Sequence, residues 1–210
     1  LSVSFLESLV NDALNKKNEF AKEDKKNEKI LLEYVSANPT GPLHIGHARG
    51  AIAGDSLARV GKYLGFDITT EYYINDAGAQ MDLLGLSVSL AARDFIFKED
   101  VVYPETYYRG EYLIDIANIV IEKFGKDIIY NESRFKEIAF FSKDLVMDII
   151  IKDLKDLGFE SDNFVSEKSL YSLWDNTKEV LEKNGSLYPK DDKIYLKSTQ
   201  YGDDSDRVVV

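Results

Sequence analysis

The sequence predicts an α/β fold: a parallel sheet that carries a helical insertion, with a β-hairpin near the C-terminus. A short apolar run, a helical pattern and a second strand-like run follow one another within residues 30–80, in the βαβ order of a parallel sheet. Successive helical patterns fill residues 81–158, which predicts an insertion. Two strand-like segments then flank Pro189-Lys190-Asp191-Asp192, a turn composition typical of hairpins.

Composition and charge narrow the class of protein. The chain has 210 residues, with 26 Lys and Arg against 37 Asp and Glu and a net charge of −11. Since nucleic-acid surfaces normally carry a basic excess, this balance argues against a main nucleic-acid-binding surface. The absence of cysteine excludes a disulfide framework and a thiolate metal site. We find no signal-peptide pattern and no uncharged apolar run of ~18 residues, and therefore expect a cytoplasmic protein with no membrane partner.

Residues 1–29 are expected to be the end of a preceding domain followed by a linker. The run Asn15–Lys29 mixes Lys with Glu and Asp, which is typical of a solvated helix face or a linker. A basic patch for nucleic acid is the alternative interpretation. The chain starts without Met and stops within a β-branched run, Val208–Val210, that resembles a strand in mid-course. We therefore expect a fragment of a longer protein.

The first βαβ unit occupies residues 30–80. Ile30–Val35 is a short apolar run rich in strand formers, as expected for a buried parallel strand. Two prolines and a glycine then predict a loop over residues 36–42. A helical pattern runs from about His44 to Leu64, and Asp67–Ile74 reads as the second strand. This order is typical of the start of a nucleotide-binding sheet.

Residues 81–158 are expected to form the helical insertion, because no convincing strand interrupts the helical patterns. The predicted helices are Ala79–Phe97, Tyr107–Phe124 and Glu132–Leu157.

Residues 159–210 are expected to begin the second half of the sheet domain. Asp162–Ser166 is a candidate strand with which the sheet resumes, and Trp174–Asn184 is a further predicted helix. The predicted hairpin strands are Ser186–Tyr188 and Lys193–Leu196.

The chain has two histidines, His44 and His47, three residues apart where a strand and a Pro/Gly loop lead into a helix. A helix N-terminus has free N–H groups and a positive dipole end, so it suits a phosphate, and imidazoles add donors. Gly46 between them leaves room for a flat ring to approach the backbone. A structural histidine is one alternative. A zinc pair is another, but zinc-protease helices place histidines four residues apart around a glutamate. We favour the phosphate interpretation.

Two stretches of the sequence resemble class I arginyl-tRNA synthetases. The run Glu33-Tyr34-Val35-Ser36-Ala37-Asn38-Pro39-Thr40-Gly41-Pro42-Leu43-His44-Ile45-Gly46-His47-Ala48-Arg49 is similar to the first signature of that family. Tyr73-Ile74-Asn75-Asp76-Ala77-Gly78-Ala79-Gln80 resembles a second string that is more specific to arginyl enzymes. Weaker resemblance continues through Tyr108-Arg109-Gly110-Glu111-Tyr112 to Tyr201–Val208. The resemblance implies part of the Rossmann-like catalytic domain of a class I synthetase.

The resemblance also implies substrates and residue roles. The family activates L-arginine with ATP and Mg²⁺ and transfers it to tRNA-Arg, with no tightly bound protein-ligated metal. The implied catalytic residues are His44 and His47. The implied ATP-binding residues are Pro42, Leu43, His44, Gly46 and His47. The implied arginine-binding residues are Glu33, Ser36, Asn38 and His47, and the signature loop consists of Asn75, Asp76, Gly78 and Gln80.

Carboxylates pair well with guanidinium groups, which suits the role implied for Glu33. A strand-end salt bridge is the alternative for Glu33, and capping of the next helix is the alternative for Asp76.

The sequence also departs from the family. Nothing in it resembles the second ATP motif, a Lys-Met-Ser-Lys-Ser-like loop, or the anticodon-binding domain. We therefore expect the fragment to be inactive, the parent enzyme to be a monomer, and tRNA-Arg to be bound mostly by parts that this chain lacks. Two other functions stay open: a small-molecule nucleotidylyltransferase, disfavoured by the Asn75–Gln80 string, and a non-catalytic synthetase-like binding module.

Overall fold

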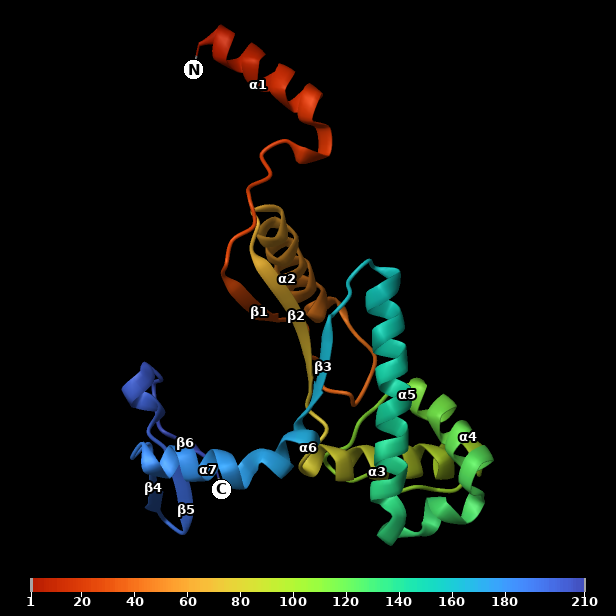
Figure 1. The fold of residues 1–210 in the computed structure, drawn as a ribbon. Coiled ribbons are helices and arrows are strands. Elements are labelled where there is room, and N and C mark those ends of the chain that lie inside the picture. Colours follow the sequence, from red (N-terminus) through yellow and green to blue (C-terminus); the bar gives the residue numbers. More distant parts are fainter. Residues whose placement is uncertain (1, 210) are drawn as a thin grey trace. The chain divides into compact units, whose positions relative to one another are not determined.

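The predicted parallel sheet is present, with the strand order β1-β2-β3. The computed structural model describes residues 2–209, and Figure 1 shows the arrangement of its elements. The strands are β1 (Lys29–Glu33), β2 (Asp67–Ile74) and β3 (Asn163–Ser166). Both strand pairs are parallel, which confirms the βαβ unit and the expected return of the chain to the sheet after the insertion.

One face of this sheet is covered by α2 (Ile45–Tyr63). Glycines on α2 allow this helix to pack closely against the sheet. A Cβ on Gly54 would lie 2.2 Å from the ring of Tyr34, and a Cβ on Gly61 would lie 2.2 Å from Cδ1 of Ile68. Because side chains alternate across a strand, the odd-numbered residues of β1 and β2 point to the opposite face. Leu31 on that face is 59% exposed.

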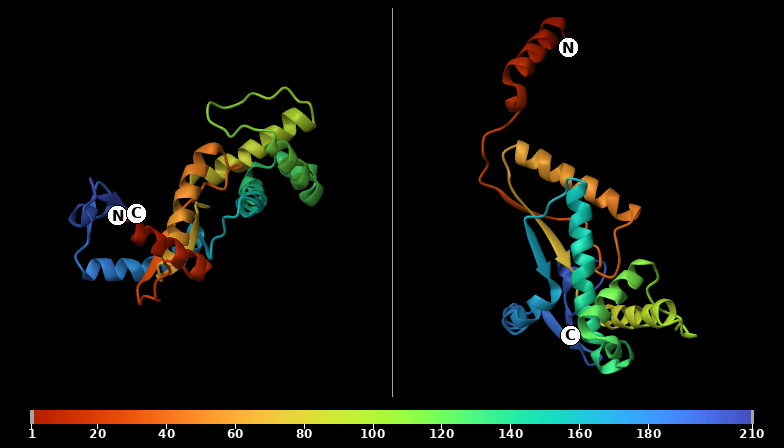
Figure 2. Two further views of the ribbon diagram at one scale, coloured as in Figure 1. Left: turned by 90° about the horizontal axis from the view of Figure 1, so that it is seen from above. Right: turned by 90° about the vertical axis from the view of Figure 1, so that its right-hand side faces the viewer.

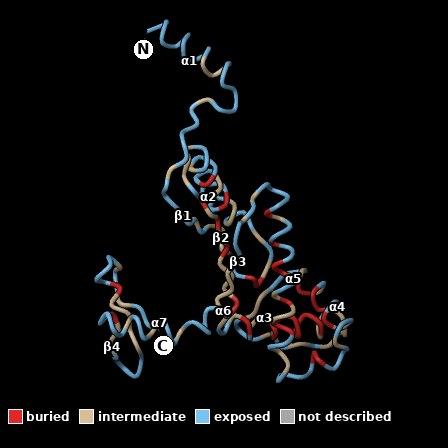
Figure 3. Tube along the Cα trace, in the orientation of Figure 1, coloured by how far each residue is buried: buried red, intermediate tan, exposed pale blue. Residues whose placement is uncertain are grey.

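The main hydrophobic core lies in the helical insertion, as Figure 3 shows by the concentration of buried residues along α3, α4 and α5. The helices are α3 (Ala79–Ala91), α4 (Tyr112–Phe124) and α5 (Phe135–Asp156), and residues Ala92–Ile96 continue α3 as a π-helical turn. Helices α3 and α5 pack closely at Gly85, where a Cβ would lie 2.2 Å from the backbone oxygen of Phe135. The insertion and the sheet belong to one unit, Leu1–Glu167, and the right-hand view of Figure 2 shows α5 beside the sheet.

Three predicted boundaries in this unit are wrong. The helix predicted from Glu132 starts at Phe135, after a 3-10 turn at Glu132–Arg134. The predicted helix from Tyr107 starts at Tyr112, because Gly110 has φ +145, a conformation that a helix cannot contain. The predicted strand to Val35 ends at Glu33, since Val35 has φ +60 and turns the chain away from the sheet.

Within residues 1–29, predicted to be a domain end and a linker, Val3–Lys16 form the helix α1. Ser2 begins this helix, its hydroxyl accepting a hydrogen bond from the amide of Phe5. None of its residues is buried.

The second unit, Lys168–Val210, contains a short antiparallel sheet with the order β4-β5-β6. Helix α6 (Glu167–Leu170) spans the boundary between the units, and α7 (Trp174–Lys183) precedes the sheet. The strands are β4 (Leu187–Lys190), β5 (Lys193–Leu196) and β6 (Arg207–Val208).

The hairpin prediction is confirmed, but its loop is shorter than predicted. Pro189 and Lys190 belong to β4, and the turn consists of Asp191 and Asp192 alone. Both aspartates have positive φ, at +51 and +58, as in a type I′ turn whose twist matches that of the strands. Of the strand-like run Val208–Val210, only Val208 belongs to β6; Val209 follows the strand, and Val210 lies outside the described residues.

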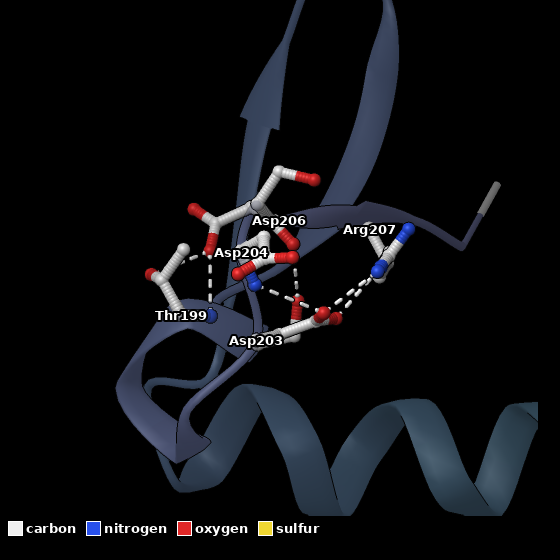
Figure 4. Close-up of polar contacts among 7 residues, drawn as sticks. Thr199, Asp203, Asp204, Asp206 and Arg207 are labelled. Atoms are coloured by element: carbon white, nitrogen blue, oxygen red, sulfur yellow. Dashed lines mark hydrogen bonds and ion pairs between the residues drawn. The ribbon is translucent and has the colours of Figure 1, made fainter.

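Hydrogen bonds between polar side chains fix the segment that precedes β6 (Figure 4). The guanidinium of Arg207 donates two hydrogen bonds of 2.6 Å to the carboxylate of Asp203, and this pairing is the largest cause that lowers the pKa of Asp203 to about 2. Asp206 accepts from the amide and the hydroxyl of Thr199. These contacts fix the loop that leads from β5 to β6.

Candidate active site

The two histidines lie together at the N-terminus of α2. His44 is the N-cap residue, and its Nδ1 accepts a hydrogen bond of 3.1 Å from the amide of Gly46. Nδ1 of His47 accepts a hydrogen bond of 3.2 Å from the amide of His44. The two imidazole rings stack with their centroids 3.8 Å apart and their planes 23° apart. The histidine turn, residues 44–47, is therefore a reciprocal cap in which the imidazoles take the place of the usual Ser and Glu side chains.

These contacts determine which nitrogen of each ring carries the proton. A neutral imidazole has one N–H donor and one acceptor nitrogen. Because Nδ1 of both His44 and His47 accepts from a backbone amide, each neutral ring carries its proton on Nε2. Both rings thus present an N–H donor on the side away from the backbone amide, at the positive end of the helix dipole. This arrangement is suited to an anion.

The electrostatics favour the neutral form of His47. Partial burial lowers the pKa of His47, and the neighbouring His44 lowers it further. A doubly protonated ring would also lose the Nδ1 acceptor that holds the amide of His44. His47 therefore stays neutral at neutral pH and donates through Nε2.

The turn requires glycine at position 46 for a steric reason. A Cβ at this position would lie 2.8 Å from Cε1 and 2.9 Å from Nδ1 of His44. Such contacts are too short, so only glycine lets the ring of His44 fold back over the turn. Besides leaving room for a flat ring, as the sequence predicts, Gly46 is thus required by the fold of the turn itself.

The loop that precedes the histidine turn is held by two tyrosines from distant parts of the chain. The hydroxyl of Tyr72 on β2 donates to the carbonyl of Ala37 at 2.8 Å, and the hydroxyl of Tyr112 on α4 donates to the carbonyl of Thr40 at 2.7 Å. Burial raises the pKa of each tyrosine to about 12, so both hydroxyls keep their protons. Between them, Pro39 and Thr40 are buried. We call residues 35–41 the anchored loop.

An open pocket of about 380 Å³ lies between the anchored loop and the start of α2. Four of the predicted site residues line it: Ser36, Asn38, Gly46 and His47. Val35, Ala37 and Gly50 complete the lining. The oxygen of Ser36 accepts a hydrogen bond of 2.9 Å from the amide of Tyr73, which fixes the side chain and leaves its hydroxyl proton for another partner.

The other residues predicted to bind ATP or the substrate arginine do not line this pocket. Pro42 and His44 are exposed on the approach to α2, whereas Leu43 packs against the core of the insertion. Glu33 is exposed at the end of β1, in register with Glu71 of β2. In parallel strands, residues in register point to the same face, so two carboxylates lie side by side on the sheet face opposite α2. Glu71 is not among the predicted site residues.

The signature loop closes on itself between β2 and α3. Nε2 of Gln80 donates to the backbone oxygen of Asn75 at 2.7 Å and to its side-chain oxygen at 2.5 Å. Gly78 has φ +75 and precedes α3 as its N-cap residue, so Asp76 does not cap this helix. Asp76 is buried instead. The hydroxyl of Ser166 lies 2.8 Å from each of its carboxylate oxygens, which share that single donor, and Nζ of Lys143 lies 3.6 Å away.

A larger cavity, of about 780 Å³, lies in the insertion and is lined mainly by aromatic and acidic side chains around Arg109. The predicted ATP and arginine residues are not among its lining residues within the described chain. Residues 2–209 contain no group of three His, Asp or Glu side chains that could hold a metal ion, and no described helix is long and apolar enough to span a membrane.

Comparison with known proteins identifies related sequences and folds. The family described as "tRNA synthetases class I (R), catalytic domain" matches residues 9–209. The chain is 78% identical to the arginine–tRNA ligase of Aliarcobacter butzleri and 55% identical to that of Campylobacter concisus, covering all of this chain and 40% of each relative. An arginyl-tRNA synthetase structure from Campylobacter jejuni is 48% identical with a TM-score of 0.88, covering all of this chain and 46% of that one. The Thermus thermophilus arginyl-tRNA synthetase, at 19% identity and a TM-score of 0.63 over 97% of this chain and 36% of that one, shares the fold.

Proposed function

The chain belongs to the catalytic-domain family of class I arginyl-tRNA synthetases, and we propose that it supplies the first half of the ATP and arginine site of an arginine–tRNA ligase. It spans 40% of the length of the curated relatives it matches. The activity proposed below therefore belongs to the longer protein that contains this chain, and the isolated chain is inactive because half of the site is missing.

The observation that carries the proposal is the histidine turn beside the pocket. Two imidazoles present Nε2–H donors at a helix N-terminus, and Ser36 and Asn38 line the same pocket. This arrangement suits the triphosphate of ATP, with the amino-acid substrate held at the anchored loop. Pro42 and Leu43 lead the chain into the turn and take part in the same ATP site.

In the first step, a carboxylate oxygen of arginine attacks the α-phosphorus of ATP, the bond to the β-phosphate oxygen breaks, and pyrophosphate leaves. Negative charge grows on the phosphate oxygens in the transition state. His44 and His47 donate to that charge through Nε2–H, and the donors are already oriented by their backbone contacts. In the second step, a terminal ribose hydroxyl of tRNA-Arg attacks the activated carbonyl and AMP leaves.

Ser36 and Asn38 hold the amino and carboxylate groups of arginine, with His47 beside them, and Glu33 faces its guanidinium. The signature loop of Asn75, Asp76, Gly78 and Gln80 supports the site by fixing the end of β2. Mg²⁺ would be held by the phosphates of ATP and would neutralise part of their charge, because Nδ1 of both imidazoles already accepts from a backbone amide and Nε2 carries a proton. We place the enzyme in the cytoplasm as a monomer, with tRNA-Arg bound mostly by the rest of the protein.

The test is arginylation of tRNA-Arg by the full-length protein with ATP and Mg²⁺. We expect charging with arginine and none with lysine, which carries a positive charge but lacks the planar fork of a guanidinium. Charging with a different amino acid, or adenylyl transfer to a small molecule without tRNA, would refute the proposal. The family match favours the synthetase over the nucleotidylyltransferase alternative.

A further inference from the structure

We propose that Tyr112, the first residue of α4 in the helical insertion, is a positioning residue for the reaction. Its hydroxyl holds the carbonyl of Thr40 and thereby sets the position of the anchored loop against the histidine turn. This inference rests on the function proposed above. It assigns to the insertion a part in building the ATP and arginine site.

The contact joins residues that are 72 positions apart in the sequence. The donor–acceptor distance of 2.7 Å is that of a good O–H···O hydrogen bond. Two glycines leave room for the tyrosine. A Cβ on Gly110 would lie 2.7 Å from Cδ1 and Cε1 of the ring, and a Cβ on Gly41 would lie 3.2 Å from the hydroxyl oxygen. The ring thus occupies a slot that both the insertion and the loop leave open.

The hydrogen bond acts on the part of the loop that carries the site residues. The amide of Thr40 donates to the carbonyl of Asn38 at 2.8 Å, so Thr40 connects Tyr112 to Asn38. On the other side, Tyr72 holds the carbonyl of Ala37. The backbone from Ala37 to Thr40 is therefore fixed at both ends, while the side chain of Asn38 stays exposed and lines the pocket.

The insertion supplies a rigid support for this contact. Leu113 and Ile116, just after Tyr112, are buried in the core shared with α3 and α5. The position of Thr40 is thus set by the packing of the insertion as well as by the sheet. A small displacement of a substrate-positioning group can lower the reaction rate by a large factor. We therefore expect turnover to fall when the insertion no longer holds Thr40 in place.

The first measurement is independent of enzyme activity. Amide hydrogen exchange of residues 37–41 is followed in the full-length protein for the parent, Tyr112→Phe and Gly41→Ala. We expect exchange about tenfold faster in Tyr112→Phe, because the loop loses one of its two anchors. Gly41→Ala crowds the hydroxyl without removing it, and we expect faster exchange there too. If Tyr112→Phe folds poorly, the exchange of residues 37–41 in Gly41→Ala decides the question, and unchanged exchange there would overturn the inference.

The matched control is Tyr103→Phe. Tyr103 also lies in the insertion, its hydroxyl donates to Asp94 at 2.5 Å, and its pKa is also raised to about 12 by burial. Among residues 2–209, Tyr103 forms no hydrogen bond with the anchored loop. Its substitution therefore tests whether the loss of any partly buried tyrosine hydroxyl in the insertion has the same effect. We expect unchanged exchange at residues 37–41 and unchanged turnover in this variant.

The second measurement is arginylation by the same proteins. We expect Tyr112→Phe to lower turnover about tenfold, with the Michaelis constant for ATP changed less than threefold. Unchanged exchange in Tyr112→Phe would overturn the inference, and so would faster exchange with unchanged turnover. A parent protein without arginylation activity would refute the proposed function instead, while the exchange data would still show whether Tyr112 holds the loop.

Discussion

At the scale of the residue, the two nitrogens of His47 have different tasks, which can be separated by substitution. Nδ1 accepts from the amide of His44, and Nε2–H is the donor proposed for the phosphate. In His47→Asn the side-chain oxygen can replace Nδ1 as acceptor, but no donor remains at the ε position. We expect normal thermal stability and turnover about 100-fold lower, with little change in the Michaelis constant for ATP.

His47→Gln is the matched variant, since its amide nitrogen can supply a donor near the position of Nε2 while the Nδ1 acceptor is lost. We expect part of the turnover to return and the helix cap to weaken, at about 1 kcal/mol of stability. Steady-state arginylation kinetics and thermal melts of both variants decide the matter. Normal turnover with a lowered melting point in His47→Asn would show that the histidine is only structural.

The lowered pKa of His47 predicts a pH dependence with a definite sign. The folded protein disfavours the charged ring, so the unfolded chain binds more protons and stability rises with pH. The stabilising contribution is complete above the ordinary value of 6.5 and is lost as the pH falls through the lower pKa of the folded state. An NMR titration of the His47 ring should give a midpoint below 6.5.

Because burial is the larger cause and His44 the smaller, His44→Asn should move this midpoint only part of the way back to 6.5. A midpoint at or above 6.5 in the parent would contradict the assignment of a neutral donor.

At the scale of the element, two helical glycines have opposite surroundings. Gly85 on α3 faces the backbone oxygen of Phe135 at the start of α5, and no rotamer change can relieve a contact with backbone. Gly85→Ala should therefore destabilise the protein by about 1–3 kcal/mol. Gly50 on α2 has no atom within 4 Å of the Cβ position, so Gly50→Ala should stabilise it by roughly 0.4–1 kcal/mol.

Urea unfolding of the full-length proteins measures both changes. Gly50 lines the pocket, so this comparison uses stability and not activity. Equal effects of the two substitutions would mean that α3 and α5 do not approach as closely as described.

At the scale of the whole molecule, the isolated chain should bind ATP no better than millimolar, because it spans 40% of the length of its relatives and carries half of the proposed site. Calorimetry on the isolated chain and on the full-length protein measures the difference. Micromolar affinity of the isolated chain would show that the histidine turn and the anchored loop suffice for ATP.

Local patterns predicted the elements well because each depends on neighbours in the sequence. The apolar run before Pro39 and the helical pattern after His44 were enough for the βαβ unit. The predicted helix end at Phe124 is confirmed, and Gly125 with φ +82 follows it. The sequence also placed the histidine pair at a helix N-terminus. It did not predict the tautomers, which follow from hydrogen bonds to backbone amides within the turn.

Contacts between distant residues were beyond such patterns. Nothing local to Tyr112 signals that its hydroxyl reaches Thr40, and nothing local to Asp76 signals its burial beside Ser166 and Lys143. The left-handed conformation of Val35 is likewise uncommon for a β-branched residue, so the end of the first strand was predicted two residues too late.

The position of Pro189 bears on self-association. Within the described chain β4 is an edge strand, and Pro189 lies opposite Ile194, whose carbonyl accepts from Val209 on the far side of β5. In antiparallel pairing this places the backbone nitrogen of Pro189 toward the open edge, where it has no hydrogen to donate. Lys190 adds a charge beside it. The open edge therefore lacks one backbone donor and carries a charge, which makes it a poorer template for a strand from a second molecule.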